Sequence, residues 1–106
     1  MSFVVRVTPE AHGAFADHAR WWAEHHSVAE AMVWFEVAFK RLDALSEMPR
    51  RHPLARENEN ATEELRELRF GIGKSLTHRA IFWLHNDVAD VLTVRHVAQD
   101  ERPPIN

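Results

Sequence analysis

The sequence contains no cysteine and no tyrosine, and it has only three glycines among its 106 residues. Without cysteine, the chain can form neither a disulfide framework nor a catalytic thiolate. No apolar run approaches the roughly 20 residues that a membrane-spanning helix needs, and the N-terminus lacks the charged and then apolar pattern of a secretion signal. We therefore expect a cytoplasmic protein without membrane contact, folded as a single domain over residues 1–106.

Basic residues are too few for a general nucleic-acid-binding protein. The net charge is −3, whereas binding to phosphates depends on an excess of lysine and arginine. Acidic residues outnumber basic ones in the first half of the chain, and the two balance in the second half. A short basic cluster is the exception, formed by Arg50, Arg51 and His52 with Arg56 nearby. The charge pattern therefore argues against broad nucleic-acid binding but allows a local contact with an anion.

The first half of the sequence predicts one strand followed by two helices. Residues 2–7 are rich in β-branched and aromatic side chains, which favour a strand. Thr8 and Pro9 then supply a capping hydroxyl and a proline at the first helical position. Residues 27–30 form a capping box that begins a second helix. Apolar residues recur at helical spacing in both segments, so we expect an antiparallel helix hairpin over about residues 9–48.

Aromatic residues in this hairpin predict a packed interior and one exposed contact. Trp34 and Phe35 follow the helical period of the second helix, which indicates packing between the helices. Trp21 and Trp22 are adjacent, and neighbouring helical residues point about 100° apart. One of these two tryptophans must therefore point away from the core. That residue is a candidate contact for a second copy of the chain or for another protein.

The second half predicts a loop and then strands. Residues 49–61 form a polar loop that two prolines stiffen. Residues 77–84 and 88–97 predict two strands from their β-branched and aromatic content, joined by a tight turn at residues 85–87. Residues 63–69 are ambiguous, because their strong helix formers favour a helix on local grounds.

Two tempting motifs do not support a cofactor or metal site. Gly73-Lys74-Ser75 matches the end of a phosphate-binding loop, but the glycine required five positions earlier is Leu68, and a strand follows where a helix is needed. The eight histidines include the adjacent pair His25 and His26, which would point in different directions on a helix. No zinc-protease motif accompanies them. We therefore expect neither a cofactor nor a metal.

The last third of the chain sets arginines and histidines into strands that are otherwise apolar. It reads HRAIFW at residues 78–83 and, after a turn, VLTVRH at residues 91–96 with Asp100 just beyond. Together with the N-terminal strand, the Thr8-Pro9 helix start and the two helices, this order resembles the RelE/ParE superfamily of type II toxin–antitoxin toxins, also known as plasmid stabilisation system proteins. The resemblance covers about residues 3–100.

The resemblance implies an α+β fold. It consists of the N-terminal strand, the antiparallel helix hairpin and a three-stranded antiparallel meander over about residues 63–98, with the helices on one face of the sheet. It also implies that residues 63–69 form a strand. Residues 101–106 would form an extended tail.

Candidate site residues come from the sheet and from the loop before it. If the two last strands pair about their turn, Arg79 lies near Arg95 and His96, and with Asp100 these could grip a phosphate and move a proton during RNA cleavage. The alternative is that Arg79 and Arg95 form ordinary ion pairs across strands with Glu64, Glu67 or Asp90. The candidate target-binding or nucleic-acid-binding residues are Arg50, Arg51, Arg56, Arg66, Arg69 and Arg79.

The resemblance implies a growth-inhibiting toxin with a cognate antitoxin as its partner. We favour the ParE-like branch, which acts on DNA gyrase and is not an enzyme. One alternative is a RelE-like endoribonuclease that cuts mRNA on the ribosome, and another is a non-toxic relative that retains only antitoxin binding. The missing tyrosine, and Gln99 where relatives often carry a basic residue, depart from the ribonuclease pattern. Assembly would take the form of a homodimer or of a toxin–antitoxin hetero-oligomer.

Overall fold

The computed structural model describes residues 2–100 of the chain, except for the side chains of residues 99 and 100. The chain begins with strand β1 (Val4–Val7) and helices α1 (Pro9–His25) and α2 (Val28–Asp43). Three short 3-10 helices follow, η1 (Ala44–Ser46), η2 (Pro49–Arg51) and η3 (Arg56–Asn60). Strands β2 (Glu64–Phe70), β3 (His78–His85) and β4 (Val88–His96) lead to the short helix α3 (Val97–Asp100).

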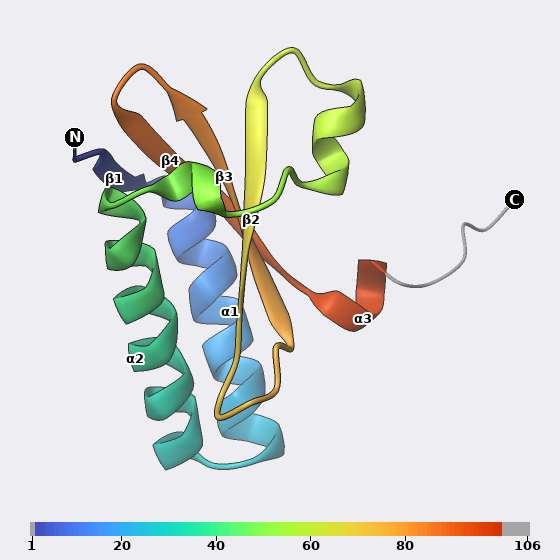
Figure 1. Ribbon diagram of the computed structural model, residues 1–106. Coiled ribbons are helices and arrows are strands. Elements are labelled where there is room, and N and C mark those ends of the chain that lie inside the picture. The colour runs from blue at the N-terminus through green and yellow to red at the C-terminus, as the bar shows by residue number, and fades with distance from the viewer. Residues whose placement is uncertain (1, 101–106) are drawn as a thin grey trace, which may run out of the picture.

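The four strands form one sheet in the order β1-β4-β3-β2. Strands β2, β3 and β4 make an antiparallel meander, and β1 pairs in parallel with β4. Helices α1 and α2 lie side by side against one face of this sheet (Figure 1). The predicted α+β architecture is therefore confirmed. The tail predicted at residues 101–106 lies outside the described residues.

The helix hairpin begins and turns where the capping residues predict. The Thr8 hydroxyl accepts a hydrogen bond from the Ala11 backbone N–H, and Pro9 occupies the first helical position. The Ser27 hydroxyl accepts from the Glu30 backbone N–H and so begins α2 only two residues after α1 ends. Such a short connection forces the two helices to run antiparallel.

Aromatic side chains fill the space between the helices and the sheet. Trp34 and Phe15 are fully buried, and each packs against Phe70 of β2. Of the adjacent tryptophans, Trp22 packs against this core, whereas Trp21 is 47% exposed. The prediction that one of the two points away from the core is confirmed.

Of residues 63–69, where the local sequence favours a helix, all but Glu63 belong to strand β2. All seven residues of β2 pair with β3 in antiparallel register, from Glu64 opposite Leu84 to Phe70 opposite His78. Leu68 and Phe70 both point into the core, which fits the two-residue period of a strand. Burial of this face against the helices outweighs the helix propensity, which amounts to only tenths of a kcal/mol per residue, about 0–0.7.

The segment before β2 lies along the outer edge of that strand, and its Glu57 reaches Arg79 on the face of the sheet away from the helices. The Ala55 backbone N–H donates to the Leu65 carbonyl at 2.9 Å, and the Glu67 N–H donates to the Pro53 carbonyl at 3.0 Å. The Asn58 side chain accepts from the Leu65 N–H at 2.7 Å. These bonds hold η3 beside the outer edge of β2 (Figure 1). The polar loop predicted at residues 49–61 is therefore an ordered cover.

Candidate functional site

Three of the predicted arginines form a row across the sheet on the face away from the helices. Arg69 of β2 is paired with Arg79 of β3, which is paired in turn with Arg95 of β4. Arg69 and Arg95 are exposed, whereas Arg79 is only 1% exposed. The expected proximity of Arg79 and Arg95 is therefore present, but the central arginine does not reach the surface.

Arg79 is held by two carboxylates. Its guanidinium donates to both oxygens of Glu57, with Nη1–Oε1 and Nη2–Oε2 distances of 2.9 and 2.5 Å. Nη1 also donates to Glu67 at 3.2 Å, and Glu67 accepts a second bond from Arg69 at 2.8 Å. The two buried or half-buried acids thus offset two arginines. This is the ion-pair alternative for Arg79, with Glu67 as one partner and with Glu57 as a partner that the sequence does not indicate.

His96 lies on the other face of the sheet. Its ring contacts His78 with centroids 4.9 Å apart, and His78 in turn contacts His18 of α1 at 5.0 Å. The indole N–H of Trp34 donates to Nδ1 of His78 at 3.3 Å. Because neighbouring strand residues point to opposite faces, Arg79 and Arg95 point away from this cluster. The structure does not bring His96 and Arg79 together on one surface.

Burial controls the protonation of His78 and His18. His78 is 2% exposed, and burial, followed by the neighbouring His18 and His96 rings, lowers the pKa of His78 to about 3. Burial also lowers the pKa of His18. Because His78 stays neutral and points into the core, His78 itself cannot exchange protons with a bound substrate. The side chain of Asp100, the fourth candidate, lies outside the described part of the structure.

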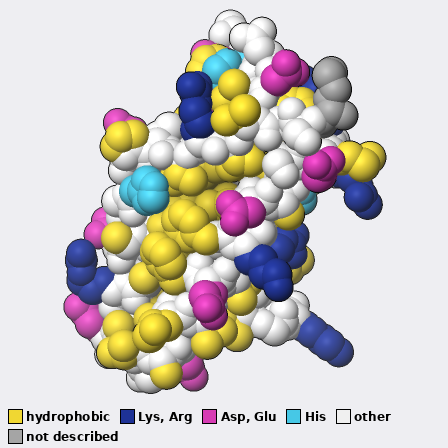
Figure 2. All heavy atoms as spheres, turned by 90° about the vertical axis from the view of Figure 1, so that its left-hand side faces the viewer, with side chains coloured by type: hydrophobic (Ala, Val, Ile, Leu, Met, Phe, Trp, Pro, Cys, Tyr) yellow, Lys and Arg dark blue, Asp and Glu magenta, His cyan; other side chains and the backbone are white. Residues whose placement is uncertain are grey.

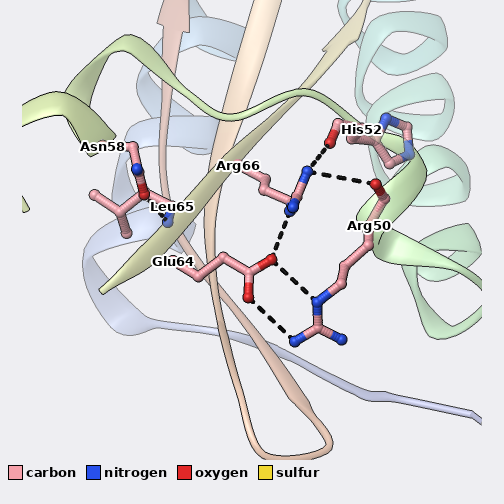
Figure 3. Close-up of polar contacts among 6 residues, drawn as sticks. All are labelled: Arg50, His52, Asn58, Glu64, Leu65 and Arg66. Atoms are coloured by element: carbon pink, nitrogen blue, oxygen red, sulfur yellow. Dashed lines mark hydrogen bonds and ion pairs between the residues drawn. The ribbon is translucent and has the colours of Figure 1, made fainter. Parts of the chain in front are cut away.

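Two of the candidate arginines, Arg50 of η2 and Arg66 of β2, share one carboxylate. Figure 3 shows Arg50 and Arg66 converging on the Glu64 carboxylate. Arg50 makes two bonds of 3.1 Å to Glu64, and Arg66 donates at 2.6 Å to the His52 carbonyl. Burial opposes ionisation of Glu64, but these arginines outweigh it and lower the pKa of Glu64. Arg51 and Arg56 are exposed.

A second polar cluster, at the β1 side of the sheet, was not predicted. Arg6 donates to both oxygens of Asp90 at 2.8 and 2.9 Å, and Oδ2 of Asp90 also lies 2.5 Å from Nε2 of His85. Trp83 stacks on His85 with centroids 3.7 Å apart. The bond from Arg6 lowers the pKa of Asp90 to about 2, against the effect of burial and with further help from His85. The parallel pairing of β1 with β4 brings these residues together.

The outer side of the helix hairpin carries an apolar surface. Figure 2 shows hydrophobic side chains forming a band along the α2 side of the molecule. Val28, Met32 and Phe35 of α2 are 66%, 67% and 39% exposed. They line a shallow groove of about 650 Å³, together with small residues of both helices. Large exposed apolar patches of this kind mark protein–protein contacts. We call Val28, Met32, Val33 and Phe35 the hairpin surface.

Other kinds of site have no counterpart within residues 2–100. No group of three histidine or acidic side chains there is arranged to hold a metal ion. None of the helices described combines the length and the apolar character needed to span a bilayer.

Comparison with known proteins supplies the fold family. No family model matches the sequence, and no curated protein matches it. The structure, however, is similar to a chain of the solved structure described as "Chromosomal ParDE TA system from P. aeruginosa", with a TM-score of 0.71 and 10% sequence identity. The match covers 91% of this chain and 97% of that chain. The chain therefore has the ParE-like fold that its sequence pattern predicts.

Proposed function

We propose that this chain is the toxin of a type II toxin–antitoxin module of the ParE-like kind. It inhibits growth through DNA gyrase and is neutralised by a cognate antitoxin. The observation that carries the proposal is the match to a ParDE structure, which extends over 91% of this chain and 97% of that one.

The hairpin surface supports an antitoxin as the partner. It places apolar side chains on the face of α2 that does not pack against the sheet. An amphipathic helix of a partner can bury such a stripe, because its own apolar residues recur at the same spacing. Acidic residues of α2 such as Glu36 border the groove, so basic residues at the margins of that helix would improve the fit.

The separation of the candidate catalytic residues on opposite faces of the sheet favours action on gyrase over RNA cleavage. A ribonuclease site needs a phosphate-binding arginine and a proton-transferring group within reach of one substrate. Here Arg79 is buried beneath Glu57, and His96 faces the helix side of the sheet. Arg95 is exposed on the face of the sheet opposite to His96. This geometry supports a toxin that acts by binding.

The test is to induce this chain alone in a bacterium and to pulse-label new protein within the first minutes. We expect translation to continue while cells filament and the DNA-damage response rises, and purified gyrase should lose supercoiling activity when the protein is added. Rapid collapse of translation would establish the ribonuclease alternative instead. Unimpaired growth together with unaffected gyrase activity would support the alternative of a non-toxic relative that retains only antitoxin binding.

Two variants sharpen this test. Arg95→Ala removes an exposed arginine of the open sheet face, and Arg20→Ala removes an exposed arginine of α1 as a matched control. Neither should unfold the protein, because exposed substitutions change stability by only about 0.5 kcal/mol. Under the gyrase proposal both variants stay toxic. A selective loss of toxicity in Arg95→Ala would favour the ribonuclease alternative.

A further inference from the structure

A pocket lies at the end of the sheet where three separate segments of the chain meet. Its volume is about 510 Å³, within the usual range of small binding pockets. The walls are Phe3 before β1, Met48 and Pro49 at the start of η2, the arginines of η2, and the turn between β3 and β4. None of these residues belongs to the hairpin surface or to the arginine row. We call it the end pocket.

Backbone hydrogen bonds hold the walls of the end pocket in place. The Phe3 N–H donates to the Ser46 carbonyl at 2.8 Å, and the Val4 N–H donates to the Asp87 carbonyl at 2.8 Å. The Arg51 N–H donates to the Met48 carbonyl at 3.1 Å, and Pro49 is buried. The pocket is therefore preformed, which lowers the entropy lost when a ligand binds.

Both non-glycine residues with positive φ among the described residues line this pocket. Asn86 has φ 52° in the tight β3–β4 turn, where asparagine is well tolerated. Met48 has φ 50°, which costs an unbranched L-residue about 1–2 kcal/mol, yet its side chain is 62% exposed. A methionine that is strained and at the same time left in solvent contributes little to folding. Its position is explained if its side chain contacts a ligand.

The two arginines of the end pocket differ in whether a carboxylate holds them. Arg50 is fixed by its two bonds to Glu64, and its guanidinium lies 5.6 Å from the centre of the Phe3 ring. Arg51 is exposed and forms no ion pair with any residue that the structure describes. The pocket thus offers one rigid cation over an aromatic ring and one unpaired guanidinium, next to the exposed side chain of Met48.

We propose that the end pocket binds a short acidic segment of a partner protein. A carboxylate of the segment pairs with Arg51, and an apolar side chain of the same segment packs on Phe3 and Met48. A bidentate carboxylate matches a single guanidinium. A nucleic acid backbone matches the pocket less well, because it needs several unpaired cations. The site stands independently of the toxin proposal.

The test titrates the ¹⁵N-labelled protein with a capped tetrapeptide, acetyl-Leu-Glu-Phe-Asp-amide, and follows the backbone amides by NMR. We expect saturable shifts at Phe3, Arg51 and Asn86, and no such shifts with the analogue that carries Gln and Asn in place of the acids. Arg51→Gln should weaken binding about tenfold, as expected for loss of a charge-assisted bond. The matched control Arg20→Gln, at an exposed arginine of α1, should bind as the wild type does.

A second variant separates ligand binding from structural roles. Glycine suits φ 50°, so Met48→Gly should leave the free energy of unfolding unchanged or raise it. The same substitution removes an apolar wall of the pocket and should weaken binding of the peptide. The proposal is overturned if Arg51→Gln and wild type bind the peptide equally, or if the shifts fall on α2. It is also overturned if a single-stranded RNA oligonucleotide shifts the same amides at lower concentration than the peptide.

Discussion

Arg79 in the middle of the sheet is bound by Glu57, which lies 22 positions earlier in a segment outside the sheet. The guanidinium is 98% buried as a side chain, whereas the Glu57 side chain is 34% exposed. Glu57 is therefore the outer ligand of a buried charge, and Glu67 is the inner one. This arrangement ties η3 to the sheet by charge as well as by backbone hydrogen bonds.

Arg79→Ala should destabilise the fold strongly. It leaves two carboxylates facing each other without their shared cation, and breaking a buried pair in this way costs about 3–5 kcal/mol. Arg69→Ala is the control, because Arg69 also binds Glu67 but has a side chain 49% exposed, and it should cost less than about 1 kcal/mol. Urea unfolding followed by tryptophan fluorescence measures both values. Equal midpoints for the two variants would contradict the buried network.

This result also bears on how toxicity is tested. An Arg79 variant that loses toxicity would do so by unfolding, so the loss could not be assigned to catalysis. Arg95, which is exposed on the next strand, is the informative position.

The stability should fall as the pH is lowered through the titration of His78. Its pKa is about 3 in the folded chain against an ordinary 6.5, so the unfolded chain binds the proton first. The contribution of neutral His78 is fully present above pH 6.5 and is lost progressively as the pH falls toward 3. Between pH 7 and pH 5 this amounts to about 2 kcal/mol for a single site. Urea midpoints measured at both pH values give the difference.

A His78→Phe variant isolates this effect. Phenylalanine keeps a ring against Trp34 but cannot take up a proton, so the difference between pH 7 and pH 5 should shrink. His18 and His52, whose pKa values burial also lowers, account for the remainder. An undiminished difference in His78→Phe would assign the acid sensitivity to those two residues.

The sequence predicts the elements well because their signals are local. Capping residues at Thr8 and Ser27 and the apolar periods of the helices act over a few residues, and the structure contains them where expected. The strand at residues 64–70 could not be derived from local propensity, because pairing with β3 decides it. There the resemblance to a known family carried the prediction.

The site was harder to predict because its contacts join distant segments. The proximity of Arg79 to Arg95 follows from the hairpin register, and the two-residue period of a strand places His96 on the opposite face. Glu57 sits in a loop, where no periodicity indicates its direction. Arg6 meets Asp90 only because β1 pairs with β4 across 84 positions, a pairing that the sequence does not signal.

Asp90 should stabilise the β1 edge at pH values above its ordinary pKa of 3.8. Its pKa of about 2 lies below the ordinary 3.8, so its contribution is present above pH 3.8 and is lost as the pH falls toward 2. Asp90→Asn removes the charge and leaves only Arg6, whose side chain is 57% exposed. We therefore expect a cost of about 1 kcal/mol. Hydrogen exchange of the β1 amides at pH 5 measures it.

The control for Asp90 is a double-mutant cycle with Arg6. If the two residues act through their ion pair, Arg6→Ala should cost little further stability once Asp90 has been replaced. Full additivity of the two substitutions would show that Asp90 acts through His85 instead.

The hairpin surface should be dispensable for folding but required for the antitoxin. Met32→Glu places a charge at a position that is 67% exposed, so the free energy of unfolding should change by only about 0.5 kcal/mol. The same charge buried against a partner helix without a counterion would cost several kcal/mol of binding. Leu54→Glu is the matched control, since Leu54 is 53% exposed, bridges to Arg66 at the outer edge of β2, and is not among the residues that line the hairpin groove.

Co-expression with the product of the neighbouring open reading frame, tagged for purification, tests this prediction. Wild type and Leu54→Glu should co-purify with the tagged protein, and Met32→Glu should not. Circular dichroism of all three chains controls for folding. If Met32→Glu co-purifies and Leu54→Glu does not, the partner binds along the outer edge of β2, where Leu54 pairs with Arg66, rather than on the helices. That outcome would move the proposed antitoxin site from the apolar face of α2 to the cover of the sheet.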